Sequence, residues 1–302
     1  MPMEIITDEA ELTRAGFHWR AQGKVLALSC TPLEQLGFSN AFSTRGGGTS
    51  PMPQDALNLA GFDEDAATNI YENRRRFLSL FEGEWALASC WQKHSADVRL
   101  VNNVDDTREP EKALGETVYC DALTTRTPRV LLGVKTADCV PVLLADARTR
   151  ACAAVHAGWR GTLSSIVART LERMATEFGT QAADINAAIG PAARACCYEV
   201  GDDVIQAFKE TFPAADEFFK ATRDRHALVD LHKANREQLI AAGVPSGQIY
   251  TAPLCTMCRT DLFFSYRREK RTHGRVGRLM SVIGRDAETR GRGDAARKEL
   301  TT

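Results

Sequence analysis

Three side chains of this sequence can together bind a metal ion or carry out nucleophilic chemistry: His94, Cys139 and His156. Their spacing is not that of a zinc finger, but ligands on separate strands of a preformed scaffold are typical of a catalytic site. Two imidazoles and a thiolate bind zinc well, and three protein ligands leave a fourth position for water, whose pKa then falls to about 7. Without a metal, Cys139 is a candidate nucleophile with His156 as its base. Both alternatives need a thiolate near an imidazole and stay open, although the second histidine favours a metal.

Two of these residues lie in the stretch 130–162, in which short apolar runs alternate with polar turns. Runs rich in valine, leucine and alanine at 130–134, 140–145 and 151–155 are typical of buried strands, and 146–150 is a plausible hairpin connection. Cys139 precedes the second run and His156 follows the third. The ends of rigid strands are therefore expected to hold both side chains.

Two segments that contain glycine are candidate anion sites. The segment 158–162 leads into an expected helix, whose N-terminus offers free amides and the positive end of a dipole. Within it, Arg160 can add a fork of donors for a phosphate or for ribose hydroxyls. Arg45 precedes three glycines, whose amides can approach a ligand closely. The alternative for both segments is a turn or loop that binds nothing.

The remaining pattern predicts a mixed α/β protein. Amphipathic helices are expected at 65–81, 163–178, 202–212 and 230–242, and strands at 25–28, 98–101, 185–189, 263–266 and 279–283. No repeat or linker divides the chain. We therefore predict a single catalytic domain over 20–285, followed by a disordered polar tail at 286–302.

Composition excludes several classes of protein. The 302 residues are 44% hydrophobic and carry a formal net charge of -1, so no overall field favours nucleic acid or an anionic membrane. No apolar run approaches the roughly 20 residues of a membrane helix. The acidic N-terminus lacks the order of a signal peptide. We expect a cytoplasmic protein with neither nucleic acid nor membrane as a partner.

The nine cysteines do not resemble a disulfide framework, because their number is odd and they are scattered along a long chain. The CxxC motif at 255–258 stands alone, which makes it weak support for a zinc ribbon. Cys196 and Cys197 are adjacent, and we interpret them as structural and poorly arranged to chelate one metal. Asp138, next to Cys139, is expected to contact a ligand, to orient a histidine or to stabilise a turn.

Long motifs now indicate a family. The segments KTADCVPVLLAD (135–146), AAVHAGWRGT (153–162), AAIGPAARACCYEVGDDV (187–204), DLHKANREQL (230–239) and FFSYRRE (263–269) resemble the YfiH family, also called laccase-domain or multicopper polyphenol oxidase proteins. STRGGGTS (43–50), LNL (57–59) and QKH (92–94) extend the resemblance over about 40–284. One departure is the segment 192–195, where the family usually has a second segment that contains glycine.

The resemblance implies an α/β (α+β) sandwich related to the catalytic domain of cytotoxic necrotizing factor, with mixed sheets flanked by helices. It implies a metal site formed by His94, Cys139 and His156, usually occupied by zinc, with copper as the alternative. We predict that four further residues contact the substrate: Arg45, Asn58, Asp138 and Arg160.

The resemblance also implies a substrate class, namely purine nucleosides and phosphate. Family members phosphorolyse adenosine, inosine, guanosine and methylthioadenosine to the free base and ribose 1-phosphate, and they deaminate adenosine. Two other activities stay open: a Cys-His amide hydrolase that edits a peptidoglycan precursor, and a copper-dependent polyphenol oxidase. The oxidase ranks low, because several copper ions need many histidines and the chain has six. A metal-stabilised binding module is the non-enzymatic alternative, and we expect a monomer or a small homo-oligomer.

Overall fold

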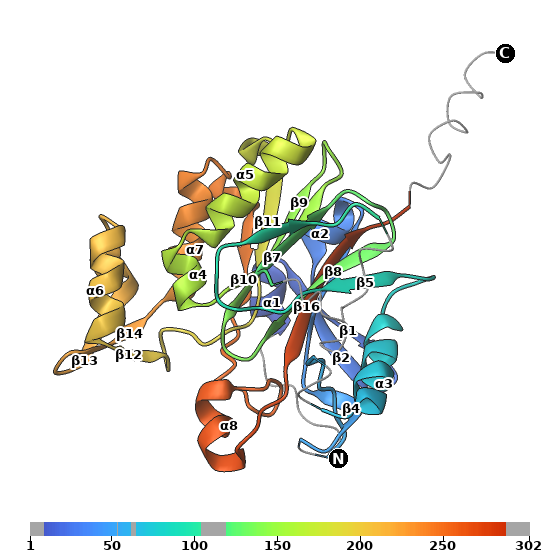
Figure 1. Cartoon of the computed structure of the whole chain (residues 1–302), viewed down its shortest axis with the longest axis horizontal. Helices are drawn as coiled ribbons and strands as arrows, with labels where there is room; N and C mark the ends of the chain where they lie inside the picture. The colour runs from blue at the N-terminus through green and yellow to red at the C-terminus, as the bar shows by residue number, and fades with distance from the viewer. Residues whose placement is uncertain (1–8, 53, 62–64, 104–118, 288–302) are drawn as a thin grey trace.

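The computed structural model describes residues 9–52, 54–61, 65–103 and 119–287, and its centre consists of two six-stranded sheets (Figure 1). In spatial order, the first sheet contains β1 (Phe17–Gln22), β2 (Val25–Cys30), β3 (Phe38–Ser43), β16 (Leu279–Arg285), β8 (Val130–Thr136) and β5 (Ala86–Ser89). The second contains β15 (Ile249–Thr251), β11 (Ile185–Ile189), β9 (Val140–Asp146), β10 (Cys152–Ala157), β7 (Ala122–Thr125) and β6 (Val98–Leu100). Both sheets mix parallel and antiparallel pairs.

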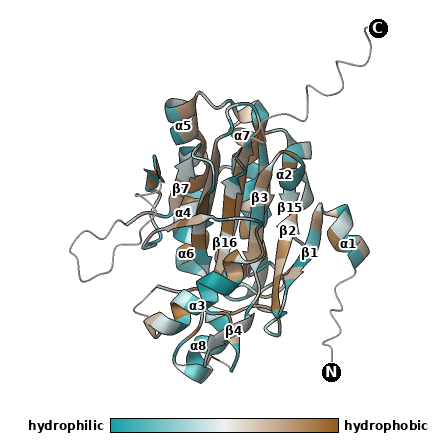
Figure 2. Ribbon diagram, turned by 90° about the vertical axis from the view of Figure 1, so that its right-hand side faces the viewer, coloured by the Kyte–Doolittle hydropathy of each residue, from teal (hydrophilic) through white to brown (hydrophobic). Residues whose placement is uncertain are grey.

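The alternation of side chains along each strand explains why the sheets stack. Successive side chains of a strand point to opposite faces. In β9, Leu143 and Ala145 join the core between the sheets, together with Leu132 of β8, whereas Val142 and Leu144 join a second core under the helices. Figure 2 shows brown, hydrophobic residues on strands in the middle of the molecule, among them β3 and β16. Both faces of β9 are therefore buried, and the predicted α/β sandwich is confirmed.

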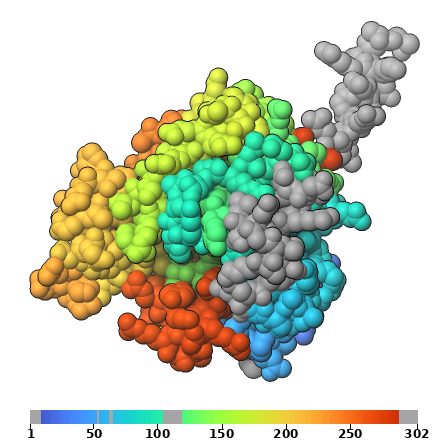
Figure 3. All heavy atoms as spheres, in the orientation of Figure 1, coloured from blue at the N-terminus to red at the C-terminus, as the bar shows by residue number. Residues whose placement is uncertain are grey.

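Helices cover the two outer faces. On the second sheet lie α5 (Ile166–Phe178) and α7 (Leu231–Ala241), and on the first sheet lies α3 (Ala67–Leu78). A small third sheet, formed by β12 (Glu199–Gly201), β14 (His226–Val229) and β13 (Phe219–Arg223), packs against α6 (Asp202–Thr211). The other elements are α1 (Glu9–Arg14), α2 (Thr31–Gln35), β4 (Gly46–Ser50), α4 (Trp159–Leu163), η3 (Ala182–Asp184), η4 (Ala215–Phe218), η5 (Ser246–Gln248) and α8 (Tyr266–His273). The orange-red α8 forms a bulge below the sheets (Figure 3).

The hairpin expected at 146–150 is confirmed, because β9 and β10 pair antiparallel with Ala145 opposite Cys152. The helix expected at 163–178 is confirmed over 166–178 as α5, but Leu163 belongs to α4, because Ser165 with a φ of 57° separates the two helices. Another expectation is wrong. The segment 263–266 is not a strand, because Ser265 instead caps α8 by accepting a hydrogen bond from the backbone N–H of Arg268 at 3.2 Å.

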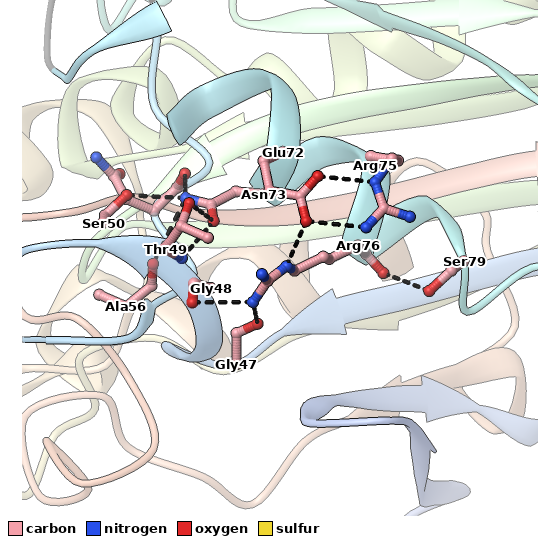
Figure 4. Close-up of polar contacts among 11 residues, drawn as sticks. Gly47, Gly48, Thr49, Ser50, Ala56, Glu72, Asn73, Arg75, Arg76 and Ser79 are labelled. Carbon is pink, nitrogen blue, oxygen red and sulfur yellow. Dashed lines mark hydrogen bonds and ion pairs between the residues drawn. The ribbon is translucent and has the colours of Figure 1, made fainter. Parts of the chain in front are cut away.

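The three glycines after Arg45 form β4 and not a ligand-binding loop (Figure 4). The guanidinium of Arg76 donates to the carbonyls of Gly47 and Gly48 at 3.0 and 3.1 Å. A Cβ atom on Gly48 would lie only 2.1 Å from the carbonyl oxygen of Ala56. Gly47 and Gly48 therefore allow close approach between backbone segments, and the Gly48 N–H donates to the Asp55 carbonyl at 2.9 Å, so this amide binds the protein and not an anion.

Two further expectations concern the C-terminal tail and the absence of a membrane-spanning helix. Residues 288–302 of the tail that we expected to be disordered lie outside the described residues. Among the residues that the structure does describe, every helix is too short or too polar to cross a bilayer.

We predict that Asn73→Ala destabilises the protein by about 2 kcal/mol, because it leaves buried polar partners unsatisfied. The Asn73 amide is fully buried, accepts from the Thr49 backbone N–H at 2.8 Å and donates to Ser50 Oγ at 2.8 Å (Figure 4). Urea denaturation measures the change. Arg75→Ala, which removes an exposed ion pair with Glu72 in the same helix, should leave the midpoint nearly unchanged. Equal losses in the two variants would contradict this role of Asn73.

Candidate active site

The structure brings His94, Cys139 and His156 together. Their ligand atoms all lie within 4.8 Å of one another, and Cys139 Sγ is 3.9 Å from His94 Nε2. The two imidazole rings meet edge to face, with their centroids 4.9 Å apart. Three residues that are distant in the sequence therefore form one cluster.

Cys139 lies where the chain crosses from one sheet to the other. It follows β8 of the first sheet and immediately precedes β9 of the second. Side-chain alternation in β10 places His156 on the same face as Cys152 and Ala154, which belong to the core between the sheets. Gly158 follows, and a Cβ atom there would lie 2.9 Å from His94 Cδ2 and 3.0 Å from Cys139 Sγ. Glycine at 158 thus allows the ligand atoms to approach one another.

His94 lies in a turn after β5, with a φ of 63° in the left-handed region. Gln92 anchors this turn to the first sheet, because its side-chain amide donates to the Lys135 carbonyl and accepts from the Lys135 N–H, each at 2.7 Å. The amide thereby continues the pairing of β5 with β8 in place of a peptide group. This geometry explains the glutamine of the QKH motif.

The fully buried Asp121 holds the cluster together. Its carboxylate accepts hydrogen bonds from the backbone N–H groups of Lys93, His94 and Ser95 at 3.2, 2.9 and 2.6 Å. It also accepts from Ser95 Oγ and pairs with His156 Nδ1, each at 2.8 Å. One carboxylate therefore fixes both the turn that carries His94 and the ring orientation of His156.

The electrostatics of the cluster favour charged groups. Burial alone raises the pKa of the Cys139 thiol, but attraction to His156 and hydrogen bonds to both imidazoles outweigh it and lower the pKa to about 6. Burial alone lowers the pKa of His156, but the Cys139 charge and the Asp121 hydrogen bond raise it to about 9. Burial likewise opposes ionisation of Asp121, yet the hydrogen bond from His156 and the attraction between them lower its pKa to about 2.

The trio opens into a pocket of about 590 Å³. In Figure 3 a shaded hollow lies just above the orange-red residues of α8. The wall carries aromatic and cationic side chains: Trp91, Lys135, Trp159, Arg160, Tyr198, Tyr266, Arg267 and Arg278. The Arg160 guanidinium lies 4.1 Å from the centroid of the Trp159 ring. The sequence-predicted Arg160 is thus beside the trio.

Asp138 also borders the pocket, but its carboxylate is bound to the protein. It accepts from Thr256 Oγ1 at 2.7 Å, Ser265 Oγ at 3.0 Å and the Arg267 N–H at 2.7 Å. These contacts stabilise a backbone φ of 88° immediately before Cys139, so the turn-stabilising alternative describes this side chain.

The other two predicted substrate contacts do not line this pocket. Arg45 forms an ion pair with Glu269 at 2.9 Å, and both side chains line a separate cavity. Asn58 is fully buried, and its amide oxygen accepts from the backbone N–H groups of Ala60 and Arg278 at 3.2 and 2.8 Å. The structure therefore assigns both side chains contacts that hold the fold.

The trio fits a zinc ion by its donor chemistry. Two imidazoles and a thiolate of lowered pKa are suitable ligands, and three ligands at an open pocket correspond to catalytic rather than structural zinc. The bond from His156 Nδ1 to Asp121 leaves Nε2 for the ion, and a metal-bound histidine usually has such a carboxylate partner. Copper also accepts imidazole and thiolate ligands.

The sequence interpretation missed two features. Asp121 stands outside every motif that we singled out, and only its position just before a buried strand could have indicated it. The expectation that Cys196 and Cys197 are poorly arranged for chelation is wrong, because both meet Cys255 and Cys258 with all four sulfur atoms within 4.8 Å.

Comparison with known proteins identifies the family. The family model described as multi-copper polyphenol oxidoreductase laccase matches residues 39–286. A relative from Bacteroides thetaiotaomicron, named purine nucleoside phosphorylase, is 38% identical over 246 residues, which cover 79% of this chain and 89% of the relative. A protein from an unknown prokaryotic organism, named adenosine deaminase, is 36% identical over 256 residues and covers 81% and 96%.

A solved structure agrees with this result. The crystal structure of YlmD from Geobacillus stearothermophilus matches with a TM-score of 0.80 and 34% identity, covering 90% of this chain and 99% of that one. The fold and the match to the family model define a laccase-domain α/β sandwich. The chain belongs to the YfiH family of laccase-domain proteins.

We predict that Asp121→Asn weakens zinc binding at the trio by roughly 10- to 100-fold, because the amide cannot accept all the hydrogen bonds that orient His94 and His156. Titration against a competing chelator measures the affinity. The matched control is Asp97→Asn, which removes an exposed carboxylate paired with Lys93 in the same segment. Unchanged affinity in Asp121→Asn would contradict this role.

Proposed function

We propose that the protein is a zinc-dependent purine nucleoside enzyme. It phosphorolyses adenosine, inosine, guanosine and methylthioadenosine to the free base and ribose 1-phosphate, and it deaminates adenosine. The observation that carries the proposal is the convergence of His94, Cys139 and His156 at a pocket walled by aromatic and cationic groups. The names of the relatives, purine nucleoside phosphorylase and adenosine deaminase, support it.

The pocket suits a nucleoside in size and chemistry. Pockets for small ligands typically enclose about 300–1,000 Å³, and this one encloses about 590 Å³. A purine ring can stack on Trp159, Tyr198 or Tyr266. A phosphate can pair with the guanidinium groups of Arg160 and Arg267 in the wall.

The chain's own residues would prepare this site for the reaction. A zinc ion held by the trio would supply Lewis acidity. Asp121 keeps His156 oriented with Nε2 towards the trio, and Cys139 is held as a thiolate by the two imidazoles. Asp138 does not contact substrate in this scheme but holds the backbone beside Cys139 through Thr256 and Arg267.

The two reactions make different demands on the pocket. In phosphorolysis the bond between ribose C1′ and purine N9 breaks, a phosphate oxygen bonds to C1′, and the purine takes up a proton. The phosphate must be held beside the ribose, which we assign to Arg160 and Arg267. In deamination a water oxygen replaces the C6 amino group, which leaves as ammonia. Both sheets contribute to the site, so we propose one catalytic domain over 20–285.

We predict that the zinc-loaded protein releases adenine and ribose 1-phosphate from adenosine when phosphate is present, and inosine when it is absent. Cys139→Ala should lower both rates by roughly 100-fold or more. Chromatography of the products measures each rate. Cys152→Ala, which removes another buried thiol from β10, should keep the activity. Wild-type protein that releases neither adenine nor inosine would refute the proposal.

One observation favours a second candidate, a thiol hydrolase that acts on an amide such as a cell-wall precursor. Asp121, His156 and Cys139 form a carboxylate–imidazole–thiolate series. Burial alone would raise the pKa of Cys139, but the attraction to His156 outweighs this effect and the pKa is lowered to about 6. Copper-dependent phenol oxidation has less support. The structure describes all six histidines, and only His94 and His156 join a metal-ligating group.

Chelation and alkylation separate the first two candidates. We expect exhaustive dialysis against a chelator to abolish nucleoside turnover and added zinc to restore it, because the trio would hold the ion that the reaction needs. The turnover of nucleoside and amide substrates is measured after chelation and, separately, after alkylation. Amide hydrolysis that survives chelation but is lost after alkylation of Cys139 would instead establish the thiol hydrolase.

A further inference from the structure

A second cluster of metal-ligating side chains lies outside the site described above. Cys196 and Cys197 come from the segment between β11 and β12, and Cys255 and Cys258 from the segment between β15 and α8. Cys258 Sγ lies 3.5 Å from Cys196 Sγ and 3.1 Å from Cys197 Sγ. All four sulfur atoms lie within 4.8 Å of one another, and none belongs to the trio.

Backbone contacts hold the two segments side by side. Strands β11 and β15 pair in parallel, and the pairing continues as a bridge between Ala192 and Cys255. The Thr256 N–H donates to the Ala192 carbonyl at 3.0 Å. The cysteine cluster is thus built at the end of the second sheet, where two strands leave it together.

Local turns then direct the thiols towards one another. The N–H groups of Cys197 and Tyr198 both donate to the Arg194 carbonyl at 2.9 Å. In the other segment, the Arg259 N–H donates to the Cys255 carbonyl at 3.0 Å, which closes a turn around the CxxC motif. These turns let the adjacent pair at 196 and 197 and the spaced pair at 255 and 258 face the same point.

The separations of the sulfur atoms match one ion rather than four unrelated thiols. Zinc lies about 2.3 Å from each thiolate in tetrahedral sites, which sets the sulfur atoms about 3.8 Å apart. The observed separations of 3.1 and 3.5 Å, and the 4.8 Å within which all four sulfur atoms lie, bracket that value. Four sulfur ligands favour zinc or iron, and hard ions such as magnesium and calcium prefer oxygen.

We propose that Cys196, Cys197, Cys255 and Cys258 form a structural zinc site, separate from the trio. Four thiolates around a divalent ion leave net negative charge, which a nearby cation stabilises. Arg268 supplies this cation, because its Nη2 lies 3.8 Å from Cys197 Sγ. Four protein ligands leave no position for water, so this zinc stabilises structure and takes no part in chemistry.

This zinc site would fix the loop that supports the active site. Thr256, between the two cysteines of the CxxC motif, donates to Asp138 Oδ1 at 2.7 Å, and the Ala193 N–H donates to the Asp138 carbonyl at 2.9 Å. Tyr198, directly after Cys197, lines the active-site pocket. The four cysteines thus act on Cys139 indirectly, as positioning residues.

Metal analysis of the intact zinc-loaded protein tests this inference. We expect Cys255→Ser/Cys258→Ser to contain about one zinc ion per chain fewer than wild type, because two of four ligands are lost. The matched control, Cys30→Ala/Cys152→Ala, removes two buried thiols of the sheets and should keep the wild-type zinc content. Equal zinc contents in the cysteine variant and wild type would overturn the proposal, as would iron in place of zinc.

A second measurement tests the same site even if the variant Cys255→Ser/Cys258→Ser does not fold. In His94→Ala/Cys139→Ala, which disrupts the trio, X-ray absorption should show the remaining zinc with sulfur neighbours only, at about 2.3 Å. Nitrogen or oxygen neighbours at about 2.0–2.1 Å would refute a four-cysteine site. So would an intact mass lower than that of the reduced chain by two thiol hydrogens, which indicates a disulfide. None of these results depends on nucleoside turnover, so they are separate from the test of the proposed function.

Discussion

The candidate site depends on the burial of one carboxylate. Asp121 is fully buried, and a buried charge is tolerated only when its hydrogen bonds are satisfied. Three consecutive N–H groups from Lys93 to Ser95 and the imidazole of His156 satisfy it. The same contacts force His94 into a left-handed conformation and bring it to His156. The cost of burying Asp121 is thus offset by the contacts that assemble the site.

The turn that connects the two sheets carries Cys139. In the stretch 130–162, β8 pairs within the first sheet, whereas β9 and β10 pair within the second. The turn between β8 and β9 therefore spans the sandwich at its edge, where Cys139 faces an open pocket and yet is held by buried strands. Asp138, bonded to Thr256, Ser265 and Arg267, keeps this turn in place.

The sequence predicted what depends on local pattern. Apolar runs located the strands beside Cys139 and His156, and motifs indicated His94 as the third member. It did not predict what depends on long-range contact. Asp121 acts through partners in two other segments, and the cysteines at 196 and 258 meet only because β11 and β15 pair in parallel. Arg45 has the residue type of a ligand contact, but its partner Glu269 is invisible until the chain folds.

The crossing turn at Cys139 has a consequence for the core. Cys139 is joined by its turn to β8 of the first sheet and to β9 of the second. Asp121, just before β7, positions the two histidines. The spacing of the three ligand atoms is thus tied to the separation of the sheets, which the side chains packed between them determine. Core residues such as Leu132 and Leu143 are therefore constrained in volume by the geometry of the trio as well as by stability.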